Sequence, residues 1–248
     1  MLLSAYNNSL RLTSNNLELA IQTAEINIEM KEADSIALEA GFFSNIIKKL
    51  ADDYIQVTVD ENYAAVIKSG KSVFKIEGKN PADFPSISTV EKENKFTMNR
   101  SVLKTMICQT IFAVAKVDAR PVLTGALIEI ENGIISIVGI DGFRIAYRYN
   151  EADAADVSSK IVVPGKSTAD IAKLLDGSDG SEANIFFTNE HVFFELDNCT
   201  IVSRLIEGDY MDYKKILASE YTTLVKIHRN ELLASLERAI LIDRKSVV

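Results

Sequence analysis

The chain has 248 residues, of which 47% are hydrophobic and only four are proline, and it contains no tryptophan. This length can bury one or two ordinary hydrophobic cores. No apolar run approaches the roughly 18–20 residues that span a bilayer, and the first residues lack the basic and long apolar parts of a signal peptide. The net charge of −8 by itself disfavours nucleic acid as a partner, because phosphate binding depends on Lys and Arg.

The two cysteines, Cys108 and Cys199, lie far apart and have no metal-ligand spacing around them. Cys108 falls on the apolar side of a helical pattern, so we expect a buried free thiol there. These features predict a reduced, cytoplasmic protein that holds neither a metal nor a cofactor.

In chain order, helical patterns alternate with short strands. SNIIKKLAD around Ile46 predicts a helix, as does the segment that begins at Phe96, in which Asn99 can cap the start. Further helices are predicted in ADIAKLLDG around Ile171 and in LVKIHRNELLASLERAILI from Leu224. The intervening segments alternate polar and apolar residues and predict strands: IQVTV, SVFKIEG, ALIEIENGIISIVGI, NIFFTNEHVFFEL and TIVSRLI.

These elements recur along the chain at a spacing of 125–129 residues. Asn16 matches Asp141, Ile46 matches Ile171, and Arg100 matches Arg229. A repeat of that length indicates duplicated domains rather than a solenoid. Each repeat combines two helices with antiparallel strands, which predicts an α+β fold. The chain is expected to open inside one repeat and to stop inside another, leaving apolar strand surface of the first repeat uncovered.

Positive charge is concentrated on the predicted helices. Residues 98–117 carry +3, residues 41–50 carry +2 and residues 166–175 carry +1. The three windows therefore carry +6 together, which leaves −14 for the rest of a chain whose net charge is −8. Solvated helix faces are an ordinary alternative explanation of such a pattern.

Four motifs carry a resemblance to a known family. ARPVLTGALIEI, IVGIDGFRIA, VVPGKSTADIAKLL and VSRLIEGDYMDYKKIL follow one another in this order. The chain resembles the bacterial DNA sliding clamp, the beta subunit of DNA polymerase III, along essentially its whole length. The resemblance implies a DNA-clamp fold with a partial first domain (1–92), a complete middle domain (93–217) and the start of a third (218–248).

The same resemblance implies a processivity factor that catalyses nothing. Two full-length protomers would close into a homodimeric ring around double-stranded DNA, and basic helices would line the hole without reading sequence. This fragment, with both end domains broken, is expected not to close a ring. The positions implied as DNA contacts are Lys48, Lys49, Arg100, Lys104, Lys116, Arg120, Lys166, Lys173 and Arg229.

A second implied site is a pocket for short peptide motifs of the replicative polymerase, the clamp loader and repair proteins. The matching positions are Leu123, Ile140, Gly142, Phe143, Arg144, Ile145, Met211 and Ile216. This chain departs from the common pattern at three positions, where Phe143 replaces a frequent His, Met211 a frequent Pro and Gly165 a frequent basic residue. Core packing is the ordinary alternative for Leu123, Ile145 and Ile216.

Other functions fit the residues less well. Pro164–Thr168 resembles the end of a phosphate-binding P-loop, but Lys160 stands where that motif needs a glycine. Neither His191 nor His228 has a nucleophile or zinc ligands at a suitable spacing. A peptide-binding module that forms no ring remains an alternative, as does a trimeric two-domain clamp of the archaeal or eukaryotic type.

Overall fold

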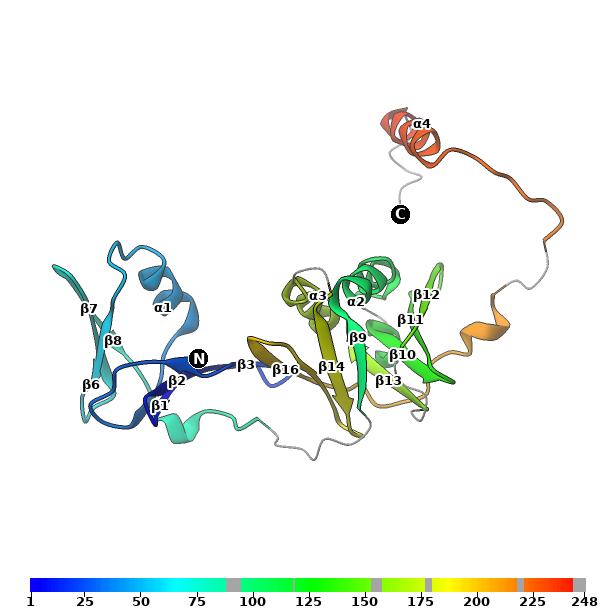
Figure 1. Cartoon of the computed structure of the whole chain (residues 1–248). Coiled ribbons are helices and arrows are strands. Elements are labelled where there is room, and N and C mark those ends of the chain that lie inside the picture. The colour runs from blue at the N-terminus through cyan, green and yellow to red at the C-terminus, as the bar shows by residue number, and fades with distance from the viewer. Residues whose placement is uncertain (88–94, 118, 153–157, 177–179, 218–220, 243–248) are drawn as a thin grey trace. The chain divides into compact units, whose positions relative to one another are not determined.

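The protein is described by a computed structural model, which covers all residues except 88–94, 118, 153–157, 177–179, 218–220 and 243–248. The chain forms two compact units, Met1–Tyr210 and Met211–Val248. The first unit combines helices with antiparallel sheets (Figure 1). This is the α+β architecture that the sequence predicts.

The first repeat runs from the N-terminus to a short 3-10 helix. Its elements are β1 (Leu2–Tyr6), β2 (Ser9–Asn15), β3 (Leu19–Thr23), β4 (Ile26–Asn27), β5 (Asp34–Ala37), α1 (Ala40–Ile47), β6 (Gln56–Val59), β7 (Ala64–Ser69), β8 (Ser72–Glu77) and η1 (Pro81–Asp83). The strands pair in the orders β5-β1-β2-β3 and β6-β7-β8, and β4 pairs with β2.

The middle repeat begins with a strand and adds a second helix. Its elements are β9 (Phe96–Asn99), α2 (Arg100–Cys108), η2 (Ile111–Ala113), η3 (Pro121–Thr124), β10 (Gly125–Glu131), β11 (Ile134–Ile140), β12 (Ile145–Glu151), β13 (Ser159–Pro164), α3 (Gly165–Leu174), β14 (Glu182–Phe187), β15 (His191–Glu195) and β16 (Cys199–Arg204). The strands pair in the orders β12-β11-β10-β13 and β16-β15-β14-β9.

The strand orders confirm the predicted duplication. The order β13-β10-β11-β12 reproduces β5-β1-β2-β3, and β14-β15-β16 reproduces β6-β7-β8. The helix α3 follows β13 in the middle repeat, just as α1 follows β5 in the first repeat. The same order of elements, with the same strand pairings, therefore occurs twice along the chain.

Each repeat has its own hydrophobic core. In the middle repeat the core lies between the two sheets and is closed by α2 and α3. Alternate strand residues point into it, as period-two side-chain alternation requires, and α2 adds Leu103, Met106 and Ile107. The smaller core of the first repeat contains Phe43 and Ile46 of α1.

One continuous sheet joins the two repeats. Strand β3 of the first repeat pairs antiparallel with β16 of the middle repeat, with Ile21 opposite Ile201. Leu19 of β3 belongs to the core of the middle repeat, and Ile21 packs against that core. The junction is thus built from both backbone hydrogen bonds and apolar burial, the two main contributions to a stable sheet.

Two details of the helix predicted from Phe96 were wrong. Residues 96–99 form the strand β9 rather than the start of a helix, because Phe96 and Met98 alternate with polar residues and pair with β14. Asn99 is nevertheless the helix cap, and its Oδ1 accepts hydrogen bonds from the N–H groups of Ser101 and Val102. Cys108 is exposed rather than buried, since it lies at the end of α2, off the Leu103–Ile107 stripe.

The second unit contains η4 (Tyr213–Lys215) and α4 (Arg229–Ile242). The helix α4 begins at Arg229 and not at Leu224, so it starts at the position that matches the first residue of α2. Leu232 and Leu236, which match the buried Leu103 and Ile107 of α2, are exposed on α4. Within the described residues, no helix is long and apolar enough to cross a membrane.

Candidate nucleic-acid interface and peptide pocket

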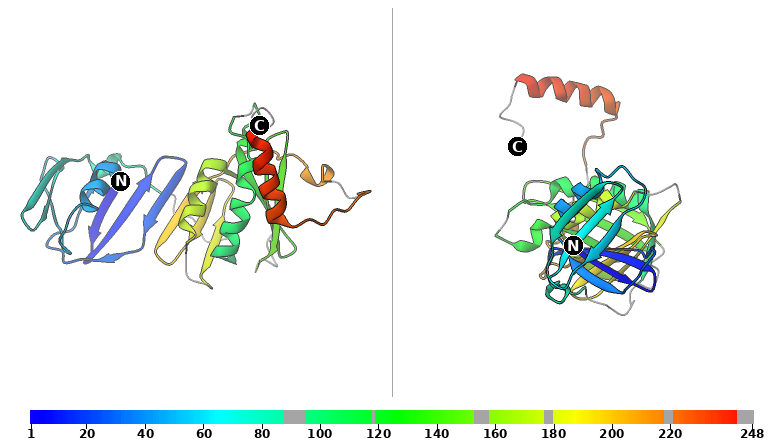
Figure 2. Two further views of the ribbon diagram at one scale, coloured as in Figure 1. Left: turned by 90° about the horizontal axis from the view of Figure 1, so that it is seen from above. Right: turned by 90° about the vertical axis from the view of Figure 1, so that its left-hand side faces the viewer.

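Three helices of the first unit lie on one side of its strands. Figure 1 and the view from above in Figure 2 show α1, α3 and α2 following one another along that side. Side-chain caps fix where two of them start: Glu39 accepts hydrogen bonds from the N–H groups of Gly41 and Phe42 at α1, as Asn99 does at α2. The strand pairing across the junction therefore brings helices of both repeats to the same side.

Four of the predicted contact residues are exposed lysines. Lys48 and Lys49 follow the last residue of α1, Lys166 lies in the first turn of α3, and Lys116 follows η2. Within the described part of the chain, the side-chain ammonium group of none of the four has a hydrogen-bond or ion-pair partner. Their ammonium groups are therefore free to meet an anion.

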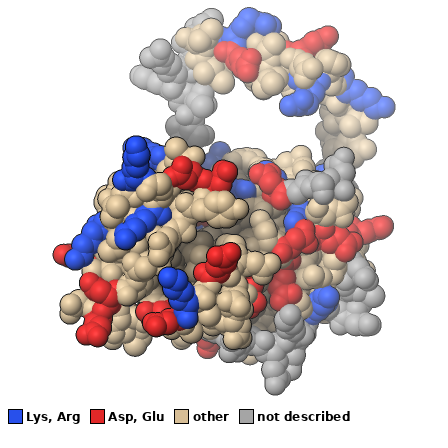
Figure 3. All heavy atoms as spheres, turned by 60° about the vertical axis from the view of Figure 1, so that its left-hand side comes forward, with Lys and Arg blue, Asp and Glu red and all other residues tan. Residues whose placement is uncertain are grey.

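Two further lysines are already paired with carboxylates. Lys173 Nζ lies 2.7 Å from Asp170 Oδ1 on α3, and Lys104 of α2 pairs with Asp176. Both pairs are solvent-exposed, where an ion pair contributes only about 0–1 kcal/mol. Figure 3 accordingly shows basic and acidic side chains interspersed on the face that it presents, with neither sign alone. An incoming phosphate could replace these partners at little cost.

Arg100 differs from the other predicted contact residues because its side chain is only 6% exposed. Its Nε donates to the carbonyl oxygen of Glu182 at 2.8 Å. Its Nη2 lies 3.0 Å from Asp197 Oδ2 but is not aligned for a hydrogen bond. In this structure Arg100 ties the start of α2 to the neighbouring strands, and its guanidinium does not face solvent.

The two remaining predicted contacts do not belong to the three helices. Arg120 is exposed just before η3 and already has an interaction partner. Arg229 begins α4 in the second unit, and its Nη1 donates to Asn230 Oδ1 at 3.5 Å. The structure thus brings the lysines of α1, α2 and α3 to one side of the first unit, whereas Arg229 belongs to the other unit.

The predicted peptide pocket centres on the loop Asp141–Arg144, here called the pocket loop. Asp141 Oδ1 accepts hydrogen bonds of 3.1 Å from the N–H groups of both Phe143 and Arg144. Gly142 has a φ of +86°, a conformation that favours glycine. This turn leaves Phe143 100% exposed, so its ring is available to a partner.

Arg144 is held between a carboxylate and an aromatic ring. Its Nε donates to Asp141 Oδ2 at 2.8 Å, and its guanidinium carbon lies 5.7 Å from the centre of the Phe112 ring, within cation–π range. Burial acts to raise the pKa of Asp141, but the hydrogen bonds from Phe143 and Arg144 outweigh it and hold that pKa below its usual value. The sequence offered no signal that Phe112 and Arg144 would meet, because they lie in different segments.

The other predicted pocket residues are less accessible. Leu123 and Ile140 are buried, and Ile145 is half-buried. The Tyr210 hydroxyl lies where strands β10 and β11 diverge, 3.4 Å from the Gly125 carbonyl oxygen and 3.3 Å from that of Val138. Met211 and Ile216 belong to the second unit; Met211 is half-buried and Ile216 exposed.

Gly165 has a packing role that accounts for the absence of a basic side chain there. A Cβ at this position would lie 2.9 Å from the Thr124 carbonyl oxygen and 2.9 Å from Val114 Cγ1. Gly165 is also the first residue of α3, directly after β13, so no phosphate-cradling loop separates strand from helix. Among the described residues, no group of His, Cys, Asp or Glu side chains could hold a metal ion.

Comparison with known families assigns both repeats. Residues 97–212 match the central domain of the DNA polymerase III beta subunit, and residues 1–88 match the N-terminal domain of the same subunit. The two matches follow the order of the two repeats along the chain.

Individual relatives agree with this assignment. The chain is 34% identical to the beta sliding clamp of Halalkalibacterium halodurans over 94% of its own length and 64% of the relative's length. The structure of a putative DNA polymerase III beta subunit from Eubacterium rectale is 39% identical, with a TM-score of 0.93 over 99% of this chain and 67% of that one. For the Bacillus subtilis sliding clamp the identity is 29% and the TM-score 0.92, over 99% of this chain and 66% of that one. The chain therefore belongs to the family of the bacterial DNA polymerase III beta subunit, the beta sliding clamp.

Proposed function

We propose that the protein is a DNA polymerase processivity factor that encircles duplex DNA without sequence preference and catalyses no reaction. The chain spans 64% of the length of its relative from Halalkalibacterium halodurans, so this activity is proposed for the whole protein. The observation that carries the proposal is the sheet β5-β1-β2-β3-β16-β15-β14-β9. It runs through both repeats and sets their helices along one side (Figure 1).

The duplex would face the lysines of α1, α2 and α3. Lys48, Lys49 and Lys166 are exposed and unpaired among the described residues, and Lys104 and Lys173 have exposed partners that water or phosphate can replace. Such contacts reach phosphates and not base edges, so they position a duplex without selecting a sequence. Individually weak contacts let the protein slide, and ring closure would then provide the retention on DNA.

We propose that the remaining basic positions have a supporting role in DNA binding. Lys116 is unpaired within the described chain and Arg120 is exposed. Arg229 would contribute from the helix of the following domain. The buried Arg100 would act by fixing the start of α2, which sets the direction in which Lys104 points.

The pocket loop would bind short motifs of the replicative polymerase, the clamp loader and repair proteins. Phe143 and Phe112 offer exposed aromatic surface, and Arg144 beside the Phe112 ring offers a cation. Met211 and Ile216 remain predicted members of the site. Aromatic and arginine side chains are the residue types that dominate binding energy at interfaces.

The proposed assembly is a homodimeric cytoplasmic ring built from clamp domains at 1–92, 93–217 and from 218 onward. Membership of the clamp family favours this function over that of a peptide-binding module without a ring. The trimeric two-domain type is disfavoured for the same reason, because the matching descriptions are those of the bacterial subunit.

Salt titration of duplex binding tests the DNA-facing surface. Each lysine that neutralises a phosphate adds about 0.9 to the slope of log affinity against log salt. Replacing Lys48, Lys49, Lys166 and Lys173 by Gln is expected to lower the slope by up to about 3.6, equally for duplexes of unrelated sequence. An unchanged slope, or a loss confined to one sequence, would contradict the proposal.

A further inference from the structure

Two carboxylates lie among the lysines of the proposed DNA-facing helices. Asp170 belongs to α3, and its Oδ1 accepts a hydrogen bond of 2.7 Å from Lys173 Nζ. Asp176 follows α3 and pairs with Lys104 of α2. The four side chains are between 36% and 77% exposed. A duplex that reaches these lysines therefore also meets two negative charges, which repel phosphate.

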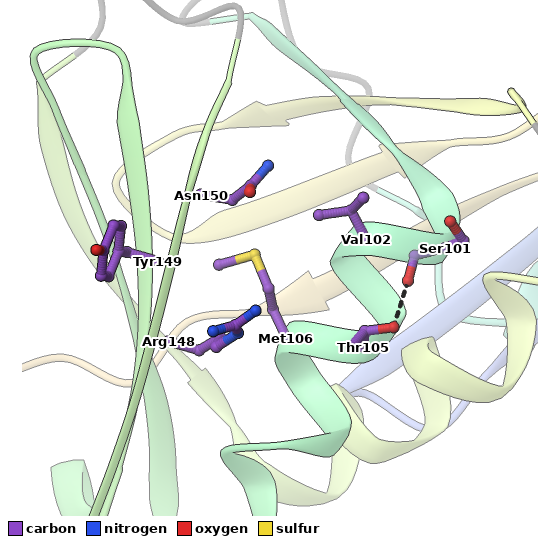
Figure 4. A pocket seen from close by; sticks show the side chains of 7 residues that line it. All are labelled: Ser101, Val102, Thr105, Met106, Arg148, Tyr149 and Asn150. Carbon is purple, nitrogen blue, oxygen red and sulfur yellow. Dashed lines mark hydrogen bonds between the residues drawn. The ribbon is translucent and has the colours of Figure 1, made fainter. Parts of the chain in front are cut away.

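Lys104 reaches toward the end of α3 and not toward the edge strand β12. The flank of α2 that faces β12 lines a cleft of about 220 Å³ (Figure 4) and consists of Ser101, Val102, Thr105 and Met106. Lys104 is not among these residues, and its ammonium group pairs with Asp176 instead. Since α2 and α3 contact each other, this pair bridges two neighbouring helices of the proposed DNA-facing side.

The first repeat has the matching lysine without the carboxylate. At the spacing of 125 residues that relates α1 to α3, Lys48 matches Lys173 and Asn45 matches Asp170. Asn45 is exposed and uncharged, and the Lys48 ammonium group has no ion-pair partner in the part of the chain that the structure describes. The same position is thus occupied by a free lysine in one repeat and by a neutralised lysine in the other, so the fold does not require the Asp170 carboxylate.

Helix stability does not account for Asp176 either. It lies two residues beyond the last residue of α3, where the negative end of the helix dipole disfavours a carboxylate. Its counterpart in the first repeat is Ala51. Exposed ion pairs also contribute little to stability, so the pairing with Lys104 gives no sufficient structural reason for this residue. A reason is to be sought in what binds to this side of the molecule.

A paired lysine binds phosphate less strongly than a free one. A free lysine that neutralises a phosphate releases a condensed cation, which adds about 0.9 to the slope of log affinity against log salt. A paired lysine must first leave its carboxylate, which then attracts a cation from solution and repels the neighbouring phosphates. Both the affinity and the slope that such a lysine contributes are therefore smaller.

We propose that Asp170 and Asp176 compete with DNA phosphates for Lys173 and Lys104, and so weaken the contact of the middle repeat with the duplex. This inference rests on the proposed function and deepens it by naming two residues that oppose binding. The first repeat, with its free Lys48, would provide the firmer contact. The middle repeat would provide contacts that exchange more easily, which suits a protein that slides.

The test is the salt dependence of binding to a short fluorescein-labelled duplex, measured by anisotropy with the 248-residue chain. Asp170→Asn introduces the residue found at this place in the first repeat. It should tighten binding several-fold at low salt and raise the slope by up to about 0.9. Asp176→Asn should do the same through Lys104. Asn45→Asp, the reciprocal change on α1, should weaken binding and lower the slope.

Two controls separate competition for a lysine from a general effect of net charge. In a chain that already carries Lys173→Gln, adding Asp170→Asn should leave the slope nearly unchanged. Asp209→Asn removes an exposed carboxylate outside the three helices, and its slope should equal that of the unmodified chain. Equal gains for Asp170→Asn and Asp209→Asn would overturn the proposed competition. A gain for Asp170→Asn that persists beside Lys173→Gln would overturn it too.

Lys48→Gln separates this inference from the proposed function. A lower slope for Lys48→Gln, together with unchanged slopes for Asp170→Asn and Asp176→Asn, would overturn the competition but leave the proposed function intact. Unchanged slopes for all three variants would overturn the proposed DNA contact as well.

Discussion

The Ser167 hydroxyl, in the first turn of α3, donates a 2.7 Å hydrogen bond to Glu18 Oε1 of the first repeat. Ser167 is only 1% exposed. The Glu18 carbonyl oxygen also accepts a 2.9 Å hydrogen bond from the Arg204 N–H. One residue of the first repeat thus fixes both a helix and a strand of the middle repeat, next to the β3–β16 pairing.

Removing the Glu18 carboxylate should lower the free energy of unfolding more than removing the Ser167 hydroxyl. Glu18→Ala leaves the buried Ser167 hydroxyl without its acceptor and should lower the free energy of unfolding by about 1–3 kcal/mol. Ser167→Ala leaves an exposed carboxylate that water can solvate, so about 1 kcal/mol is expected. Urea unfolding measures both changes. Glu18→Gln, which keeps an acceptor, is the control, and simple additivity in the double variant would contradict a direct contact.

The pocket loop should keep its turn when an amide replaces the Asp141 carboxylate. Asn16 holds the matching loop of the first repeat by accepting from the N–H groups of Glu18 and Leu19, as Asp141 does in the pocket loop. Asp141→Asn should therefore keep the turn and lose only the exposed Arg144 ion pair, a change of at most about 1 kcal/mol. Asp141→Ala, which removes the acceptor, should lose more.

The pH dependence of stability gives a second test at Asp141. The pKa of Asp141 is lowered in the folded state. The ionised carboxylate therefore stabilises the folded state above the unfolded-state pKa of about 3.9. This stabilisation is lost as the pH falls through the folded-state pKa. The stability difference between the unmodified chain and Asp141→Asn should accordingly shrink below about pH 4. A difference that stays constant down to about pH 2 would contradict this reading.

Replacing Gly165 by a residue with a side chain should destabilise the folded state. Gly165→Ala brings a Cβ to 2.9 Å from the Thr124 carbonyl oxygen, a backbone atom that cannot rotate away, so a loss of about 2 kcal/mol or more is expected. Gly142→Ala is the comparison, because its Cβ would meet nothing within 4 Å and only the φ of +86° opposes it. Thermal unfolding should therefore show the larger loss for Gly165→Ala, and the reverse order would refute the packing argument.

Tyr210 should ionise late. Burial raises the pKa of Tyr210 to about 12, against about 10 for an unfolded tyrosine. The protonated Tyr210 hydroxyl therefore leaves the stability of the folded state unchanged below about pH 10. Stability falls as the pH rises from there toward 12, because the unfolded state ionises first. The difference between the phenolate absorbance titrations of the unmodified chain and Tyr210→Phe should reveal one group that titrates near 12. A difference centred near pH 10 would show that the hydroxyl is not buried.

Local pattern was sufficient to predict the duplicated plan, because Asn16 and Asp141 match in sequence and also make the same turn. Local pattern was insufficient at Phe96, because the four-residue strand β9 directly precedes the helix α2. The strand periodicity and the helix periodicity of the apolar residues overlap there. The burial of Arg100 depends on neighbours from distant segments, Glu182 and Asp197. The pairing of β3 with β16 is likewise a long-range contact that no local pattern encodes.

Retention on DNA of different topology tests the clamp account most directly. The full-length gene product, loaded on a nicked circular duplex, should stay bound through gel filtration at a salt concentration that abolishes simple phosphate contacts. Cutting the circle once should release it, because a sliding ring leaves over a free end. Equal retention on the circular and the linear duplex would mean that the protein grips DNA and does not encircle it.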